Sequence, residues 1–179
     1  MHEVMEVPEA HGHNEEYPLT IPVAVTMSIL AVLVAVATLL GHRASVEEMI
    51  LQTKATDQWA YFQAKKNSLH QMTAYADMFG TFTPVDKEKA AISREKYMRE
   101  GERYEKETDE IGEQARELEK ERDLAGHRED RFDAGEVILE IGLIICSLTL
   151  LTKKKLFWLS GIALGVAGFF VMLSGFLVH

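Results

Sequence analysis

The sequence is poor in the residues that interrupt helices and in those that cross-link chains. It has only four prolines in 179 residues, and after Pro22 the next one is Pro84. Because proline breaks helices more strongly than any other residue, this long interval is compatible with one very long helix. The single cysteine, Cys146, excludes an intrachain disulfide and says nothing about the redox compartment.

The sequence also lacks the motifs of common enzymes. It contains no phosphate-binding loop, dinucleotide fingerprint, nucleophile elbow or HExxH motif. The net charge of −9 disfavours nucleic acid as a partner. The histidines and acidic residues of segment 1–18 match no recognised metal-ligand spacing, so we expect a solvated acidic tail there. We therefore expect no enzyme, no catalytic residue, no cofactor and no metal.

Charge is rare in three apolar segments. Residues 21–40 contain none, and twenty residues are enough to cross about 30 Å of hydrocarbon as a helix. No Lys or Arg precedes this segment, which argues against a cleaved signal peptide. Two further runs are separated only by Thr-Lys-Lys-Lys and should form a helical hairpin. We predict an all-α, multi-pass protein of the lipid bilayer, with spans at 19–41, 134–152 and 156–178 and a basic turn at 153–155.

Residues 42–133 are rich in charged residues and contain one turn signal, Pro84, within segment 80–86. Apolar residues recur in steps of three and four on both sides of it, which predicts a long antiparallel coiled-coil hairpin, or stalk. Folding the chain about residue 83 places Phe62 opposite Tyr104 and Gly41 opposite Ala125. This register leaves surplus residues in the return limb. We therefore expect a break at Gly126 and, over 127–135, a bend or an interfacial segment in place of plain coiled coil.

The orientation of the stalk depends on the basic residues near the span ends. Lys153, Lys154 and Lys155 lie in a short hairpin, and this favours a cytoplasmic turn and an extracytoplasmic stalk. Other basic residues near the stalk ends favour the opposite orientation: Arg43, Arg116, Lys120, Arg122, Arg128 and Arg131. We give more weight to the short hairpin, because long domains cross membranes largely regardless of charge.

Two carboxylates, Glu136 and Glu140, lie four residues apart and therefore on one face of the second span. A carboxylate within a span is costly and is a functional candidate by default, as a proton carrier, a cation ligand or part of a pore. The alternative is that both are stabilised by the helix dipole and pair with His42 or Arg43 at the adjacent end of the first span.

Small residues recur along the third span. Gly161, Gly168 and Gly175 are spaced by seven residues, and Gly165 lies between them. Such stripes allow helices to approach closely. A protomer with three spans has little interior of its own, so we expect a homo-oligomer.

The segment ATDQWAYFQAKK, residues 55–66, carries three aromatic residues within the stalk. Trp59 and Phe62 fall in the seam and should face the partner helix near Thr108 and Tyr104. The remaining residues of interest form a stripe on another face: Asp57, Tyr61 and Lys65, with Gln58 beside them. This stripe could meet a neighbouring protomer, with Asp57 and Lys65 pairing across the interface, or it could bind a separate protein.

The chain resembles an uncharacterised bacterial membrane-protein family that is catalogued as a domain of unknown function. Its members share a segment like SDQWAYYQAK, a charged helical hairpin and two closing spans joined by a short basic turn. The corresponding segments here are ATDQWAYFQAKK and TKKKLFW, with Thr56 in place of Ser and Phe62 in place of Tyr. The resemblance implies this architecture and a bacterial inner membrane, but no activity.

We expect a non-enzymatic, homo-oligomeric membrane scaffold whose stalk binds a partner. The alternative is an oligomeric channel or transporter with Glu140 near the pore. A pore requires Glu140 to face a shared axis, whereas a scaffold allows it to pair with Arg43 inside one protomer.

Overall fold

A computed structural model describes residues 19–81 and 86–178 of the chain. Within them there is no β-strand, so the prediction of an all-α protein with three long helices is confirmed. The acidic tail, 1–18, and the tip residues 82–85 lie outside the described part. The elements are α1 (Thr20–Thr81), α2 (Lys87–Thr152), α3 (Lys155–Ser174) and a short 3-10 turn, η1 (Gly175–Leu177).

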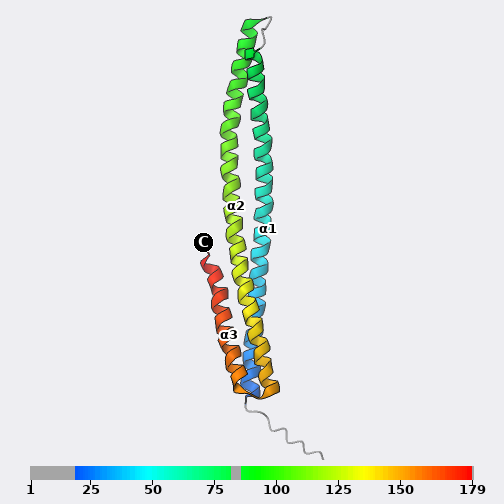
Figure 1. Ribbon diagram of the computed structural model, residues 1–179, viewed down its shortest axis with the longest axis vertical. Helices are drawn as coiled ribbons and strands as arrows, with labels where there is room; N and C mark the ends of the chain where they lie inside the picture. Colours follow the sequence, from blue (N-terminus) through cyan, green and yellow to red (C-terminus); the bar gives the residue numbers. More distant parts are fainter. Residues whose placement is uncertain (1–18, 82–85, 179) are drawn as a thin grey trace, which may run out of the picture.

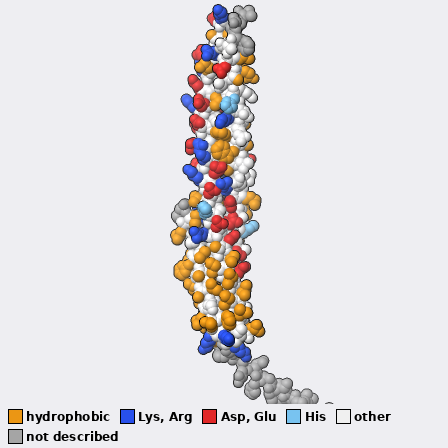
Figure 2. Space-filling model, viewed as in Figure 1, with side chains coloured by type: hydrophobic (Ala, Val, Ile, Leu, Met, Phe, Trp, Pro, Cys, Tyr) orange, Lys and Arg blue, Asp and Glu red, His pale blue; other side chains and the backbone are white. Residues whose placement is uncertain are grey.

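Helices α1 and α2 run antiparallel along the whole length of the molecule, and α3 packs beside them at one end (Figure 1). With 62 residues and a rise of about 1.5 Å per residue, α1 is about 93 Å long. Hydrophobic side chains cover the end that contains α3, and charged side chains cover the rest (Figure 2). We call these two parts the apolar end and the stalk.

The apolar end holds stretches of all three helices that are long and apolar enough to cross a membrane. In their most apolar windows only 17%, 28% and 22% of the residues are buried inside the molecule, for α1, α2 and α3 respectively. The chain by itself therefore leaves most of this apolar surface uncovered.

A single seam of buried residues holds α1 against α2. In α1 the buried residues recur every seven positions from the apolar end into the stalk, at Val23, Leu30, Ala37, Ala44 and Leu51. In α2 the same spacing links Ala125, Phe132, Leu139 and Cys146. A strict seven-residue period keeps a seam turned toward its partner helix. Both helices therefore pass from the apolar end into the stalk without a break.

The expected break at Gly126 and the bend over 127–135 were wrong. Helix α2 continues through this segment, and Phe132 occupies the seam position between Ala125 and Leu139. Gly41 also lies within a continuous helix.

The register of the hairpin differs from the expected one by about one seven-residue repeat. Gly41 lies against Phe132 and Asp133 rather than Ala125, and Phe62 lies against Gly112 rather than Tyr104. Such a shift preserves the periodic pattern, which explains why the pattern alone did not reveal it.

The surplus residues are taken up at the tip of the stalk. Gly80, next to the end of α1, faces Arg94, so the first turns of α2 extend beyond the end of α1 (Figure 1). Asp86 caps these turns, because its carboxylate Oδ1 accepts a hydrogen bond from the backbone N–H of Lys89 at 3.1 Å. The tip is therefore asymmetric, whereas the expected register assumed a symmetric turn about residue 83.

Helix α3 packs on α2 through glycines on both helices. A Cβ atom added at Gly168 would lie 3.0 Å from both the carbonyl oxygen of Gly135 and the backbone nitrogen of Leu139. One added at Gly142 would lie 3.1 Å from the carbonyl oxygen of Gly161. The two backbones thus approach as closely as small residues permit.

We predict that Gly168→Ala destabilises the protein, because its methyl group would meet backbone atoms that cannot move aside. Overpacking of this kind costs about 1–3 kcal/mol. The matched control is Gly80→Ala, whose Cβ would lie 3.5 Å from the flexible Arg94 side chain and which should be neutral or slightly stabilising. Thermal unfolding of the full-length protein in detergent measures both changes. Equal stability of the two variants would contradict the close contact.

Candidate functional site

Lys65 of the ATDQWAYFQAKK segment points toward α2. Its Nζ lies 2.6 Å from Oε2 of Glu107, and the two side chains are only 22% and 36% exposed. The ammonium group also lies over two aromatic rings, 5.5 Å from the centre of Tyr61 and 5.1 Å from that of Tyr104. The hydrogen bond between Lys65 and Glu107 is the largest cause that raises the pKa of Lys65 and lowers that of Glu107.

This contact corrects the expected stripe. Lys65 bonds to a carboxylate of its own chain, so it is not free to pair with Asp57 of a neighbouring protomer. Asp57 and Tyr61 remain on the surface, and Tyr61 is 50% exposed. Of the stripe residues, only these two present open side chains to another molecule.

Trp59 and Phe62 contact α2, as expected for seam residues, but at different partners. Trp59 donates a hydrogen bond from Nε1 to Oε1 of Glu119 at 2.9 Å, and its ring meets the edge of Phe62 with centroids 5.2 Å apart. A Cβ atom added at Gly112 would lie 3.1 Å from the Phe62 ring, so the ring fills the space above that glycine. Thr108 and Tyr104 were the expected neighbours.

Polar side chains also cross the seam elsewhere in the stalk. Gln58 donates from Nε2 to Oε1 of Gln114 at 2.8 Å, and Arg122 donates from Nη1 to Oε1 of Gln52 at 2.7 Å. These exposed pairs flank the seam, and each would lose its partner if the register shifted by one repeat. The register expected from the sequence places other residues opposite Gln58 and Arg122, so it did not predict these pairs.

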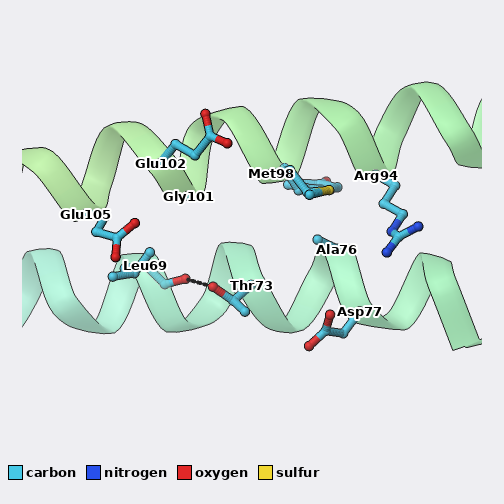
Figure 3. A pocket seen from close by; sticks show the side chains of 10 residues that line it. Leu69, Thr73, Ala76, Asp77, Arg94, Met98, Gly101, Glu102 and Glu105 are labelled. Atoms are coloured by element: carbon cyan, nitrogen blue, oxygen red, sulfur yellow. Dashed lines mark hydrogen bonds between the residues drawn. The ribbon is translucent and has the colours of Figure 1, made fainter.

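A shallow hollow of about 240 Å³ lies between α1 and α2 near the tip. Figure 3 shows why it forms: Leu69 and Thr73 face the small Gly101, which leaves space between the helices. Asp77 and Glu102 point away from the gap, whereas Arg94 and Glu105 extend into it near its opposite ends and do not meet (Figure 3). The hollow therefore lacks the converging polar groups of a ligand site.

At the apolar end the two carboxylates have different surroundings. Glu136 is half-buried and accepts a hydrogen bond from Oγ1 of Thr38 at 2.6 Å. Glu140 is exposed, with the exposed side chains of Val137, Ile141 and Ile144 on the same helix. Among the described residues it has no hydrogen-bond or ion-pair partner.

The alternative in which these carboxylates pair with His42 or Arg43 is not realised. Gly41 is level with Phe132, so Glu140 lies nearly three helical turns further into the apolar end than Arg43. Arg43 itself is exposed and has no ion-pair partner within the described part of the chain. The four glycines of α3, by contrast, all lie in buried positions, Gly175 at its C-cap.

An apolar groove of about 480 Å³ separates α1 from α3. Gly165 and Thr26 form part of it, and Oγ1 of Thr26 accepts a hydrogen bond from Nε1 of Trp158 at 3.1 Å. Its remaining lining is Ile29, Leu30, Leu33, Ile162, Val166 and Phe169. The groove has almost no polar group, so it could hold an apolar group but has no side chain that could act in catalysis or bind a charged ligand.

A family model matches residues 19–178, nearly the whole chain. The chain belongs to the DUF4337 family. This family is described as a domain of unknown function, which confirms the resemblance to an uncharacterised family. No curated protein and no solved structure matches the chain. Membership of DUF4337 supplies no activity, so any function must follow from the residues themselves.

In the described ranges no three His, Cys, Asp or Glu side chains are grouped as metal ligands would be.

The contact between Lys65 and Glu107 predicts a pH dependence with a definite sign. The pKa of Glu107 is lowered, so its contribution to stability is present above about pH 4.3 and is lost as the pH falls through the folded-state pKa. The pKa of Lys65 is raised, so its contribution is fully present below about pH 10.4 and is lost as the pH rises through the higher folded-state pKa. Removing both partners should lower the melting temperature by a few degrees at neutral pH.

The measurement is the melting temperature of the full-length protein in detergent between pH 3 and pH 7. The Lys65→Met/Glu107→Gln variant should lose less stability on acidification than the unmodified protein. Arg116→Met/Glu113→Gln removes an exposed pair within one helix and serves as the control, with acid sensitivity unchanged. If acid sensitivity were the same in all three proteins, the pair would have no stabilising role.

Proposed function

We propose that this chain is a non-enzymatic membrane scaffold, in which three spans anchor a coiled-coil stalk that binds a partner protein. The observation that supports this most strongly is the seam that continues from the apolar end to the stalk without a break in either helix. Two continuous helices therefore connect the stalk tip to the spans, so the tip is held at a fixed distance from the spans. A shape of this kind suits a spacer, or a stalk that holds a binding site for a partner protein away from the bilayer.

The membrane placement follows from the uncovered apolar surface. The apolar stretches of α1, α2 and α3 would aggregate in water, but lipid would cover them. The turn between α2 and α3 is closed by Lys153, whose left-handed φ of 56° ends α2. Its three lysines lie at the end of the molecule opposite the stalk tip (Figure 2), so a cytoplasmic turn implies an extracytoplasmic stalk. We propose a bacterial inner membrane, as the family resemblance implies.

Glu140 supports a homo-oligomer. An ionised carboxylate that faces lipid near the middle of a span costs on the order of 3 kcal/mol. A second copy of the chain packed over Glu140, Val137 and Ile144 would shield the carboxylate from lipid and cover apolar surface at the same time. In the stalk, the exposed Asp57 and Tyr61 lie where a neighbouring protomer or a partner protein could contact them.

The exposed carboxylate of Glu140 is also compatible with a second function, that of a channel or transporter. If several protomers turned Glu140 toward a common axis, the carboxylates would form a ring that attracts cations. In that case the protein would be a channel or transporter for a cation or small solute. The scaffold needs Glu140 only as a contact between protomers.

We predict that the purified protein has the mass of several protomers and that Glu140→Leu shifts it toward one protomer. Interhelical hydrogen bonds of polar side chains hold spans together, and leucine removes them. Native mass spectrometry of the detergent complex measures the mass. The control, Glu117→Leu, changes an exposed carboxylate of the stalk and should leave the mass unaltered.

A single protomer for the unmodified protein, or an unchanged mass for Glu140→Leu, would contradict the proposed interface. The channel alternative makes its own prediction, because Glu140→Gln preserves hydrogen bonding but removes the charge. Loss of cation flux into proteoliposomes with an intact complex would favour the channel over the scaffold.

A further inference from the structure

A crevice of about 240 Å³ lies where the stalk meets the apolar end, between α1, α2 and η1. Its polar side carries Arg43, Arg128 and Glu47, and its other side is apolar. The apolar lining consists of Leu40, Ala44, Phe132, Gly175 and Phe176. The crevice therefore joins two guanidinium groups to a hydrophobic wall in one place.

The two guanidinium groups are available for a ligand. Arg43 is exposed and makes no ion pair in the described part of the chain, and Glu47 forms none with either arginine. Among the described residues Arg128 has one hydrogen-bond partner, the carbonyl oxygen of Val178, to which its Nε donates at 3.3 Å, and its terminal nitrogens make no contact of this kind with them. Four arginines of the stalk, by contrast, each contact a carboxylate of the same helix: Arg99, Arg103, Arg116 and Arg122.

The hydrophobic wall is well ordered by packing. Phe132 is only 5% exposed, and its ring meets that of Phe176 edge-on with centroids 5.3 Å apart. Phe176 is 54% exposed, so it continues the wall onto the outer surface beside Leu40. From this level α1 has no charged residue down to Thr20, and Figure 2 shows the change from charged to hydrophobic surface at the junction of stalk and apolar end.

We propose that this crevice binds a glycerophospholipid, with its phosphate between Arg43 and Arg128 and an acyl chain along Leu40 and Phe176. Guanidinium groups bind phosphate oxygens through paired, charge-assisted hydrogen bonds. The position at the edge of the apolar end is the depth at which lipid phosphates lie in a bilayer. The inference rests on the proposed membrane placement, but it adds a site, a ligand class and two binding residues.

The test uses the full-length protein purified in a mild detergent and then depleted of lipid. Native mass spectrometry measures the binding of three probes: phosphatidylglycerol, diacylglycerol without a phosphate, and inorganic phosphate. We expect phosphatidylglycerol to bind. Diacylglycerol should bind at least about tenfold more weakly, because it lacks the group that the arginines hold. Inorganic phosphate should neither bind detectably nor displace the lipid.

The variant Arg43→Gln/Arg128→Gln should lose phosphatidylglycerol binding by a similar factor. The control, Arg99→Gln/Arg116→Gln, removes the same charge from exposed pairs in the stalk and should bind as the unmodified protein does. Equal binding of phosphatidylglycerol and diacylglycerol, or equal binding by the two variants, would overturn the proposal. Binding of inorganic phosphate as strong as that of the lipid would show an anion site instead.

The comparison of the three probes uses the unmodified protein, so it decides the question even if the variant fails to fold. A failure here is also distinct from a failure of the proposed membrane placement. If the chain were released from cell membranes without detergent, the scaffold proposal would be wrong. If the chain stays in the membrane but retains no phospholipid, only this site would be wrong.

Discussion

The structure depends on a seam of buried residues between α1 and α2, which repeats every seven positions and includes many small residues. Alanines at positions 37, 44, 55, 115 and 125 are at most 5% exposed, and they let the two long helices approach along their length. Because the period is the same in the apolar end and in the stalk, neither helix needs to bend where its environment changes from apolar to charged. The polar contacts of Lys65 and Gln58 then select one register among those that the period permits.

The apolar end uses small residues for a second purpose. Gly135 and Gly142 of α2 face Gly168 and Gly161 of α3, so the two backbones lie close together, and large side chains such as Leu139 and Phe132 pack against the glycines of α3. This arrangement attaches α3 to α2 and leaves a groove against α1. It also leaves Glu140 outside the packed interior, surrounded by exposed aliphatic side chains. The features that point to a second protomer and to lipid are thus consequences of how three helices with glycine stripes pack.

Much of the fold could be predicted from the sequence, because hydrophobic periodicity reports helix faces directly. The three helices, the antiparallel hairpin and the seam positions of Trp59 and Phe62 follow from that signal. The register does not, since a shift by one seven-residue repeat leaves the apolar pattern intact. That error produced the false bend at 127–135 and concealed the bond between Lys65 and Glu107. The crevice at Arg43 and Arg128 brings together α1, α2 and η1, so the true register was needed to find it.

The most direct test of the account is amide hydrogen exchange of residues 126–133 in the full-length protein, measured by mass spectrometry in lipid nanodiscs. This segment lies just outside the apolar end. A continuous helix there predicts slow amide exchange, whereas a bend predicts fast exchange. If α2 is continuous, its amides are hydrogen-bonded and packed against α1, and they should exchange as slowly as those around Ile111 in the middle of the stalk. Exchange as fast as that of an unstructured peptide would contradict the continuous seam and the rigid connection between the apolar end and the tip.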